Sequence, residues 1–198
     1  MKLLVLILIF TFSNSFAQNS YIVDKKGNKI LTRDEVTDIL LVDKRISYVN
    51  LGKSWEKYIK FEDLDHAVIG PSLLKSFHLN QKKKADVYFV YGEKNDRKLV
   101  GLAYIIETTQ GHYVEGFKKT FYELYLIDNN ETILDQINGT STNTEGKIAL
   151  RGEISPFIKK YFSDCPALMT KLSKYDLKDQ NNREILSFFF DTEYIKCQ

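Results

Sequence analysis

Residues 85–91 read Ala-Asp-Val-Tyr-Phe-Val-Tyr, a run rich in β-branched and aromatic side chains. These residue types favour a β-strand, in which successive side chains point to opposite faces. Val87, Phe89 and Tyr91 therefore share one face, and Tyr88 and Val90 share the other. Both faces are apolar, so we expect other parts of the chain to cover this strand on both sides.

Shorter runs of the same character occur at intervals as far as about Asn138. They are separated by turn sequences such as Gly92-Glu-Lys-Asn-Asp96 and Asp128-Asn-Asn130. The further strands that we predict are Arg45–Leu51, Lys57–Phe61, Ala67–Ile69, Leu99–Thr108, Lys119–Ile127 and Ile133–Ile137. Helical periodicity is almost absent between them, so the crossover helices of a parallel sheet are mostly missing. An antiparallel sheet is therefore indicated.

The beginning of this region contains a predicted hairpin and an ambiguous segment. Tyr21–Asp24 and Lys29–Leu31 flank a turn in which a glycine and an asparagine tolerate positive φ, which is typical of two short paired strands. Thr32 and Glu35 then have the spacing of a helical capping box. The β-branched and apolar run Val36–Val42 equally indicates a strand, and both alternatives stay open.

The composition changes after Asn138. The small-polar stretch Gly139–Gly146 predicts a loop. Ser155 followed by Pro156 has the pattern of a helix N-cap and first helical residue. Apolar residues then recur at helical spacing, at Phe157, Ile158, Tyr161, Phe162, Leu168, Leu172, Ile185, Phe188 and Phe189. We therefore predict two to three short C-terminal helices.

Together these patterns predict an α+β fold, with a mostly antiparallel, twisted sheet or partly closed roll and two to three C-terminal helices packed on it. We expect residues 18–198 to form a single domain, because a chain of this length is ample for one core and short for two. Residues 18–138 would form the β-rich part of this domain, and residues 139–198 the helical part.

The first seventeen residues have the pattern of a secretory signal peptide. Lys2 supplies a positive charge, Leu3–Phe12 is almost entirely apolar, and Ser15 and Ala17 are small residues at the −3 and −1 positions before Gln18. The apolar run is about half the roughly 20 residues that span a bilayer, so no transmembrane anchor is expected. We predict cleavage after Ala17 and export to the periplasm or outside the cell.

Cys165 and Cys197 are the only two cysteines of the chain. Disulfides persist after export, and a bond here would close a loop of about 33 residues, with a stabilisation of roughly 3–4 kcal/mol on the chain-entropy model. A redox or metal-binding pair would need CxxC spacing or adjacent histidines, and the sequence has neither. We predict a structural disulfide.

The densest acidic cluster is Glu62-Asp-Leu-Asp-His66. In an extended chain Glu62 and His66 would share one face, and Asp63 and Asp65 the other. Two adjacent carboxylates can bind a hard cation or share a proton, so Asp63, Asp65 and His66 are the candidate catalytic residues. A solvated strand end is the alternative. No DxDxDG loop accompanies the cluster, and we predict neither a metal nor another cofactor.

Trp55 lies in a polar loop sequence. Exposed tryptophan often marks recognition, so Trp55 is the candidate ligand-binding residue, with capping of the core as the alternative. Lys82-Lys83-Lys84 is interpreted as a solvated turn that discourages edge-to-edge pairing. His78 and His112 are isolated, without an HExxH pair.

Two stretches carry a resemblance to known proteins. The apolar N-terminal segment passes into Gln18 with little linker, and Tyr161-Phe-Ser-Asp-Cys-Pro166 precedes a Leu/Lys-rich stretch. These features resemble small exported proteins of Bacteroidota bacteria, which are largely uncharacterised. The resemblance implies no activity, and no functional residues are carried over from it.

The bulk composition excludes few functions. A formal charge of +2, with 43% hydrophobic and 27% charged residues, is typical of a folded protein and gives no reason to expect nucleic acid as a partner. No GxSxG elbow, phosphate-binding glycine loop or Rossmann fingerprint is present. We interpret the chain as an exported soluble protein that binds a small molecule or an envelope protein without catalysis. The alternative is a small secreted hydrolase whose acidic and histidine site is assembled in space.

Overall fold

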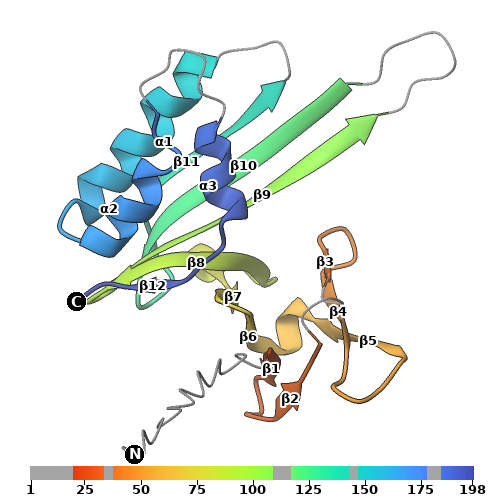
Figure 1. The fold of residues 1–198 in the computed structure, drawn as a ribbon. Helices are drawn as coiled ribbons and strands as arrows, with labels where there is room; N and C mark the ends of the chain where they lie inside the picture. Colours follow the sequence, from red (N-terminus) through yellow and green to blue (C-terminus); the bar gives the residue numbers. More distant parts are fainter. Residues whose placement is uncertain (1–19, 34–37, 109–116, 143–146, 178–183) are drawn as a thin grey trace, which may run out of the picture.

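The computed structural model describes residues 20–33, 38–108, 117–142, 147–177 and 184–198. The fold is α+β, as predicted from the sequence, with a large and a small sheet followed by C-terminal helices (Figure 1). The predicted signal peptide, residues 1–17, lies outside the described residues, and so does His112. Within the described ranges, no helix combines the length and the apolar character needed to cross a membrane.

The large sheet is built mainly from hairpins. Its strands are β1 (Tyr21–Asp24), β2 (Lys29–Leu31), β6 (Leu64–Ile69), β7 (Ser72–Phe77), β8 (Asp86–Lys94), β9 (Arg97–Thr108), β10 (Phe117–Asp128), β11 (Ile133–Thr142) and β12 (Ile195–Lys196). They are ordered β11-β10-β9-β8-β7-β6-β1-β2, and β12 runs parallel to β8 at Gly92 and Glu93, beyond the start of β7. All other described pairs of this sheet are antiparallel. The described sheet is open, with β11 and β2 at its edges.

The small sheet contains three antiparallel strands, β3 (Asp38–Leu40), β4 (Arg45–Val49) and β5 (Glu56–Lys60). A strand at Asp38–Leu40 confirms the strand alternative for that part of the ambiguous segment. Residues 34–37, including most of the capping box, lie outside the described residues. A single bridge between Thr32 and Asn50 joins the end of β2 to the end of β4.

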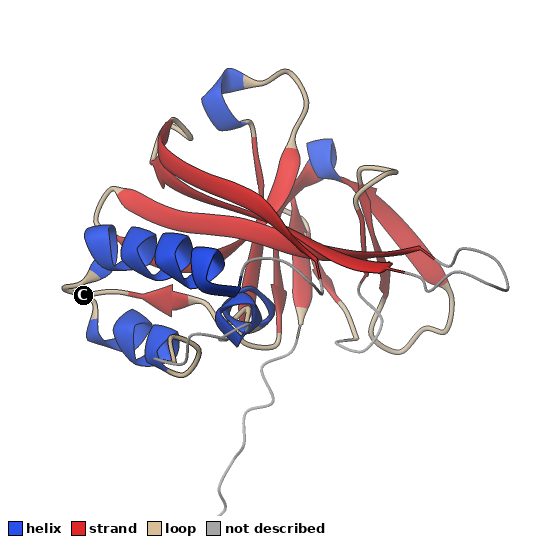
Figure 2. Cartoon of the chain, turned by 90° about the horizontal axis from the view of Figure 1, so that it is seen from above, coloured by secondary structure: helices blue, strands red, loops and turns tan. Residues whose placement is uncertain are grey.

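The helices and the small sheet lie at opposite sides of the molecule, and the long strands β9 and β10 extend between them (Figures 1 and 2). The helices are α1 (Lys147–Phe162), α2 (Pro166–Ser173) and α3 (Ser187–Phe190). They cover one face of the large sheet. The core that they form with it includes Tyr91, Leu99, Tyr122, Leu124, Leu126, Ile154, Phe157, Ile158, Phe162, Leu168, Leu172, Phe188 and Phe189.

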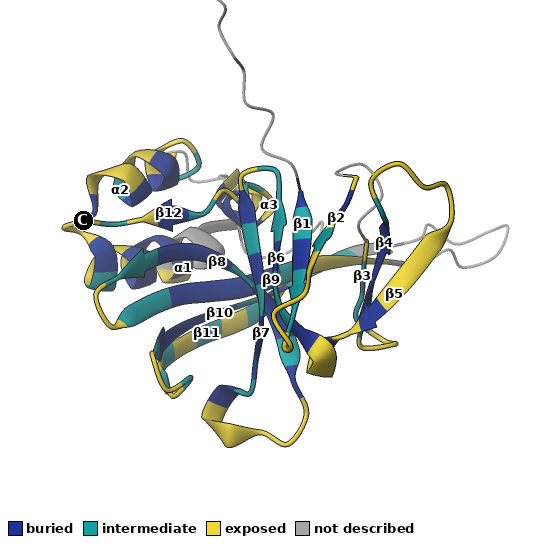
Figure 3. Cartoon of the chain, turned by 90° about the horizontal axis from the view of Figure 1, so that it is seen from below, coloured by how far each residue is buried: buried dark blue, intermediate teal, exposed yellow. Residues whose placement is uncertain are grey.

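The expected coverage of both faces of β8 is confirmed (Figure 3). Tyr91 belongs to the core beneath the helices, and Val87 belongs to a second core beneath the small sheet. Tyr88 and Val90 point the other way, into a third apolar cluster that contains Val100. The two-sided apolar pattern of this strand therefore corresponds to cores on both of its faces.

Two local predictions about the C-terminal region are wrong. Helix α1 begins at Lys147, so Ser155 is not its N-cap and Pro156 lies inside the helix. Ser155 is buried and donates a hydrogen bond to the Asp176 carboxylate (2.7 Å), while Pro156 is exposed. The loss of one backbone hydrogen bond on an exposed helix face is offset by apolar burial on both sides of the proline in the sequence.

The predicted loop at Gly139–Gly146 is wrong for its first half. Strand β11 continues to Thr142, which pairs with Lys119 of β10. A Cβ atom on Gly139 would lie 2.6 Å from the Tyr122 hydroxyl, so a residue without a side chain is needed where the tyrosine crosses the neighbouring strand. Glycine here reflects close packing within a sheet.

Strand β7 was not predicted. Its sequence, Ser-Leu-Leu-Lys-Ser-Phe, places serines at two positions that face the protein interior. Ser76 is buried and donates a hydrogen bond to the Phe61 carbonyl (2.6 Å), and Ser72 lies 2.6 Å from the Thr192 hydroxyl. Because both hydroxyl groups have partners inside the fold, polar residues occupy positions where sequence patterns require apolar ones.

Candidate functional site

The acidic stretch Glu62–His66 is not one continuous strand. Phe61–Asp63 forms a 3₁₀ turn and β6 begins at Leu64, so the predicted sharing of faces within this stretch is wrong. Phe61 and Leu64 are both buried in the core beneath the small sheet, and a tight turn brings side chains three residues apart to the same side. Glu62 instead accepts a hydrogen bond from the backbone N–H of Ala85 (2.7 Å).

The three candidate catalytic residues lie around the start of β6. Asp65 Oδ2 is 2.7 Å from His66 Nδ1, and the His66 ring meets Tyr21 edge-on, with ring centroids 5.9 Å apart. Asp63 is exposed in the preceding turn. Among the described residues, no three His, Cys, Asp or Glu side chains are grouped in a way that could hold a metal ion. A catalytic role for Asp63, Asp65 and His66 stays a prediction.

A cavity of about 540 Å³ lies between the small sheet and strands β8–β10, and Phe61 in its lining directly precedes the acidic cluster in the sequence. This volume is in the range of small-molecule binding sites. The lining residues come from separate parts of the chain. They are Leu41, Val42 and Lys44 at the β3–β4 turn, Phe61 in the 3₁₀ turn, Lys82 before β8, and Asp86, Val87, Tyr88, Leu102, Tyr104, Ile106 and Glu123 on the strands.

One wall of this cavity is apolar and open to solvent. Leu102, Tyr104 and Ile106 alternate along β9, so they share the face that points away from the helices. Tyr104 stacks on Phe121 of β10, with ring centroids 5.2 Å apart and an interplanar angle of 8°. Ile106 is 43% exposed, and Val42, from the opposite side of the cavity, is 97% exposed. The cavity therefore presents apolar surface to water from both sheets.

A close ion pair connects the two sheets at the cavity. The Lys44 ammonium donates a hydrogen bond to the Asp86 carboxylate of β8, and the Lys44 carbonyl accepts one from the Phe61 backbone N–H (3.0 Å). Lys82 lines the same cavity, and it makes no ion pair with any residue that the structure describes. The described part of the cavity wall therefore holds one paired and one unpaired cation.

A tyrosine pair supports the carboxylate on the β10 side. Tyr125 donates a hydrogen bond to Glu123 Oε2 (2.6 Å), and Tyr88 meets Tyr125 edge-on at 5.4 Å between ring centroids. Burial raises the pKa of both Tyr88 and Tyr125 well above the usual range for tyrosine, so both hydroxyl groups stay neutral. These groups are hydrogen-bond donors and fixed dipoles.

The lining residues that the structure describes include no serine, threonine, cysteine or histidine. The arrangement is suited to holding a molecule with an apolar body.

Trp55 is 55% exposed, so it does not cap the core. It lines a second hollow, of about 510 Å³, together with Arg33, Leu51, Gly52, Lys53 and Ser54. The Lys53 ammonium lies 5.2 Å from the centre of the indole ring. This hollow is at the β4–β5 end of the small sheet, whereas the cavity is at the β3–β4 end.

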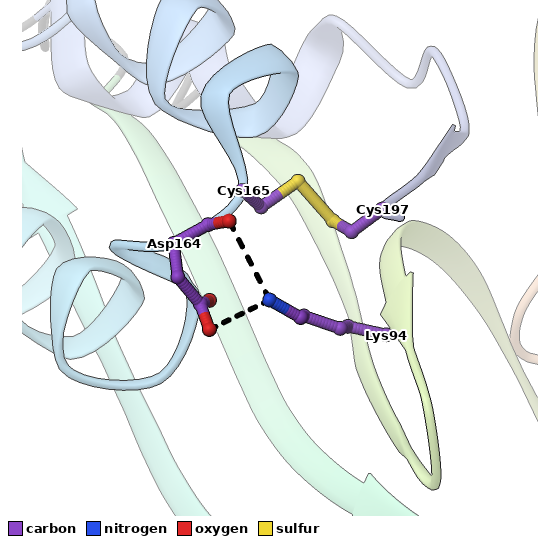
Figure 4. Close-up of a disulfide and its surroundings, with 4 residues drawn as sticks. All are labelled: Lys94, Asp164, Cys165 and Cys197. Atoms are coloured by element: carbon purple, nitrogen blue, oxygen red, sulfur yellow. Dashed lines mark hydrogen bonds and ion pairs between the residues drawn. A yellow bond between two sulfur atoms is a disulfide. The ribbon is translucent and has the colours of Figure 1, made fainter.

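The predicted disulfide between Cys165 and Cys197 is confirmed, with Cα atoms 5.5 Å apart (Figure 4). It joins the start of α2 to the C-terminus. Lys94 lies beside it and forms an ion pair with Asp164 (2.6 Å), and the Cys197 N–H donates to the Glu93 carbonyl (2.8 Å). The bond therefore holds the terminal segment against β8.

Sequence reasoning missed the cavity, because its walls meet only after folding. The one signal in the sequence was the alternation of Leu102, Tyr104 and Ile106 on a strand whose other face carries its own apolar residues.

No family model matches the chain, and comparisons with curated proteins and with solved structures give no match.

Proposed function

We propose that the protein is a non-catalytic binding protein that holds a small amphipathic molecule in the cavity between its two sheets. The observation that carries this proposal is the exposed apolar wall formed by Val42, Tyr104 and Ile106 at a cavity of ligand size. Exposed apolar side chains are common singly, but a group that lines one concave site is typical of a binding surface. A bound apolar body would cover this wall.

The polar groups suggest which end of the ligand carries charge. Lys82 lines the cavity without an ion-pair partner among the described residues, whereas Lys44 is neutralised by Asp86. Glu123, on β10, disfavours a second negative group near the stacked Tyr104 and Phe121 rings. The ligand that fits is an apolar or aromatic molecule with one acidic group, oriented with that group towards Lys82.

We propose further that the protein works after export, in the periplasm or outside the cell. Two observations support this. The disulfide between Cys165 and Cys197 is of a kind that persists in oxidising compartments. The sequence of residues 1–17 has the charge, the apolar core and the small-residue exit of a signal peptide.

The binding proposal is tested with a fluorescent apolar anion, anilinonaphthalene sulfonate, and two variants of adjacent residues. Ile105 and Ile106 are 41% and 43% exposed, but they point to opposite faces of β9 and only Ile106 lines the cavity. Ile106→Asp places a carboxylate in the apolar wall and should weaken binding of the probe at least tenfold. Ile105→Asp, the matched control, should stay within about twofold of the unchanged protein.

Equal weakening by both substitutions would mean either that the probe binds outside the cavity or that both variants lose affinity because the fold is less stable. The melting temperatures of the two variants separate these causes. Unchanged binding in Ile106→Asp would contradict the proposed site directly.

A further inference from the structure

The far end of the small sheet carries a second exposed surface, separate from the cavity. Leu51 follows β4, and its backbone N–H donates to the carbonyl of Leu31 at the end of β2 (2.9 Å). The Arg33 N–H donates to the Val49 carbonyl (3.0 Å). The end of β2, with the residues that follow it, and the β4–β5 loop therefore lie side by side and form one surface. We call Leu31, Arg33, Leu51, Lys53, Trp55 and Lys57 the basic tip.

Three large apolar side chains of the basic tip are in water. Leu31 is 43% exposed, Leu51 53% and Trp55 55%. Leu51 and Trp55 line one hollow, and the backbone of Leu31 is hydrogen-bonded to that of Leu51. Grouped exposure of this kind, at the end of a short sheet, marks an interaction surface.

The charges around this apolar group are mostly positive. Arg33 and Lys53 line the hollow with Trp55, and Lys57 is exposed on the adjoining strand. Lys29 is exposed on the same face of β2 as Leu31. Glu56, the acidic residue between Trp55 and Lys57, accepts a hydrogen bond from the Tyr58 hydroxyl (2.6 Å). Among the described residues, the cations around the apolar centre therefore outnumber the one carboxylate, that of Glu56.

We propose that the basic tip docks the protein on the surface of an anionic membrane. Trp55 and Leu51 enter the headgroup region, where an indole ring is accommodated well, and Lys53 and Lys57 contact lipid phosphates. Three apolar side chains are too few for a stable protein interface, which needs roughly 20–30 residues a side. The same side chains with several cations are sufficient for peripheral binding to anionic lipid.

The proposal goes beyond ligand binding and is independent of it. Strand β4, which is 5 residues long, separates the basic tip from the cavity, a distance of roughly 15 Å. Docking through the tip leaves Val42 and Lys44, at the other end of the small sheet, free of the bilayer. A protein held in this way keeps its cavity open to the surrounding water.

The test uses a property of the unmodified protein. Trp55 is the single tryptophan of the chain, so its emission reports on the basic tip alone. Vesicles of phosphatidylglycerol mixed with phosphatidylcholine should shift this emission to shorter wavelength and protect it from acrylamide. Added salt should reverse both effects, because screening shortens the range of the attraction. Vesicles of phosphatidylcholine alone should give little change.

Charge reversal then locates the contact. Each basic residue near an anionic surface is worth about fivefold in binding, so the double variant Lys53→Glu/Lys57→Glu should weaken vesicle binding at least tenfold. The matched control, Lys83→Glu/Lys84→Glu, makes the same change of net charge at another exposed place and should have a small effect. Ile106→Asp should bind vesicles as the unchanged protein does.

Three results would overturn the proposal. The first is no shift of emission with anionic vesicles, and the second is equal weakening by the two double variants. The third is a concentration-dependent shift without vesicles, because that would show self-association through the tip. Failure of anilinonaphthalene sulfonate to bind the cavity would contradict the proposed function and would leave the vesicle result unaffected.

Discussion

Lys171 of α2 donates a hydrogen bond from its buried ammonium group to the carbonyl oxygen of Glu193, at 2.8 Å. The side chain is only 2% exposed, and its ammonium lies 5.4 Å from the ring centres of both Tyr91 and Phe188. Asp191 provides a counter-charge at 3.4 Å. This lysine therefore joins α2 to the segment that leads from α3 to β12.

Lys171→Ala should lower the free energy of unfolding by about 3–4 kcal/mol, because it leaves Asp191 without its counter-charge and removes a packed side chain. Lys171→Met keeps the length of the side chain against Tyr91 and Phe188 and should lose less than half as much. Urea denaturation measures both changes. Thr170→Ala, at the exposed neighbouring position, serves as the control, and equal losses in all three variants would contradict the proposed role.

The hydroxyl groups of Tyr175 and Tyr194 should make the fold sensitive to alkali. The hydrogen bond from Tyr175 to Asp191 raises the pKa of Tyr175 to about 12, and burial with a hydrogen bond to Glu93 raises the pKa of Tyr194 to about 12. The unfolded chain releases these protons near pH 10. The folded state then holds more protons than the unfolded state, so the free energy of unfolding should fall between about pH 10 and pH 12.

Tyr175→Phe and Tyr194→Phe should each reduce this slope, since phenylalanine has no proton to lose. The measurement is the urea midpoint at a series of pH values from 9 upward. A slope unchanged in both variants would show that other groups govern alkaline unfolding.

Reduction of the Cys165–Cys197 disulfide should lower the free energy of unfolding by roughly 3–4 kcal/mol, on the chain-entropy model for a loop of this length. The effect should be largest at β12, because its pairing with Gly92 and Glu93 depends on a held terminus. Hydrogen exchange should therefore accelerate at Ile195 and Cys197 before it does in α1. Reductant added to a Cys165→Ala/Cys197→Ala variant should have no further effect, and a response there would reveal another cause.

Lys82 should select for the charge of the ligand. Lys82→Glu should weaken binding of anilinonaphthalene sulfonate about tenfold or more, but it should leave the uncharged analogue phenylnaphthylamine nearly unaffected. Lys84→Glu, two residues further along the same exposed run, makes the same change of net charge without lining the cavity. Equal loss for both probes would mean that Lys82 acts by shape, and equal loss in both variants would indicate a general field effect.

Some features of the fold could be predicted from the sequence, and others, although they depend on neighbouring residues, could not. The two apolar faces of Ala85–Tyr91 indicated the coverage of β8, and the export pattern with an even cysteine count indicated the disulfide. The helix start predicted from Pro156 was wrong, because apolar packing on either side of the proline keeps the helix continuous. The loop predicted from Gly139 was wrong, because this glycine makes room for the side chain of Tyr122 on the neighbouring strand.

The cavity could not be predicted from the sequence, because its walls come from distant parts of the chain. Val42 lies in a segment whose sequence fits two structures, and the residues opposite it come from β8, β9 and β10, which follow it at long separations. Their meeting depends on how the small sheet packs on the large one. Trp55 is exposed, in agreement with its polar neighbours in the sequence, and its role in ligand binding stays a prediction.

The cavity between the two sheets is proposed to hold an apolar ligand. The most direct measurement is a methyl NMR titration of the protein with phenylnaphthylamine. The methyl resonances of Val42, Leu102 and Ile106 should shift together with a single dissociation constant, while those of Ile105 and Leu51 stay in place. Shifts confined to Ile105 or Leu51, or none at the cavity under conditions in which the probe is bound, would contradict the claim.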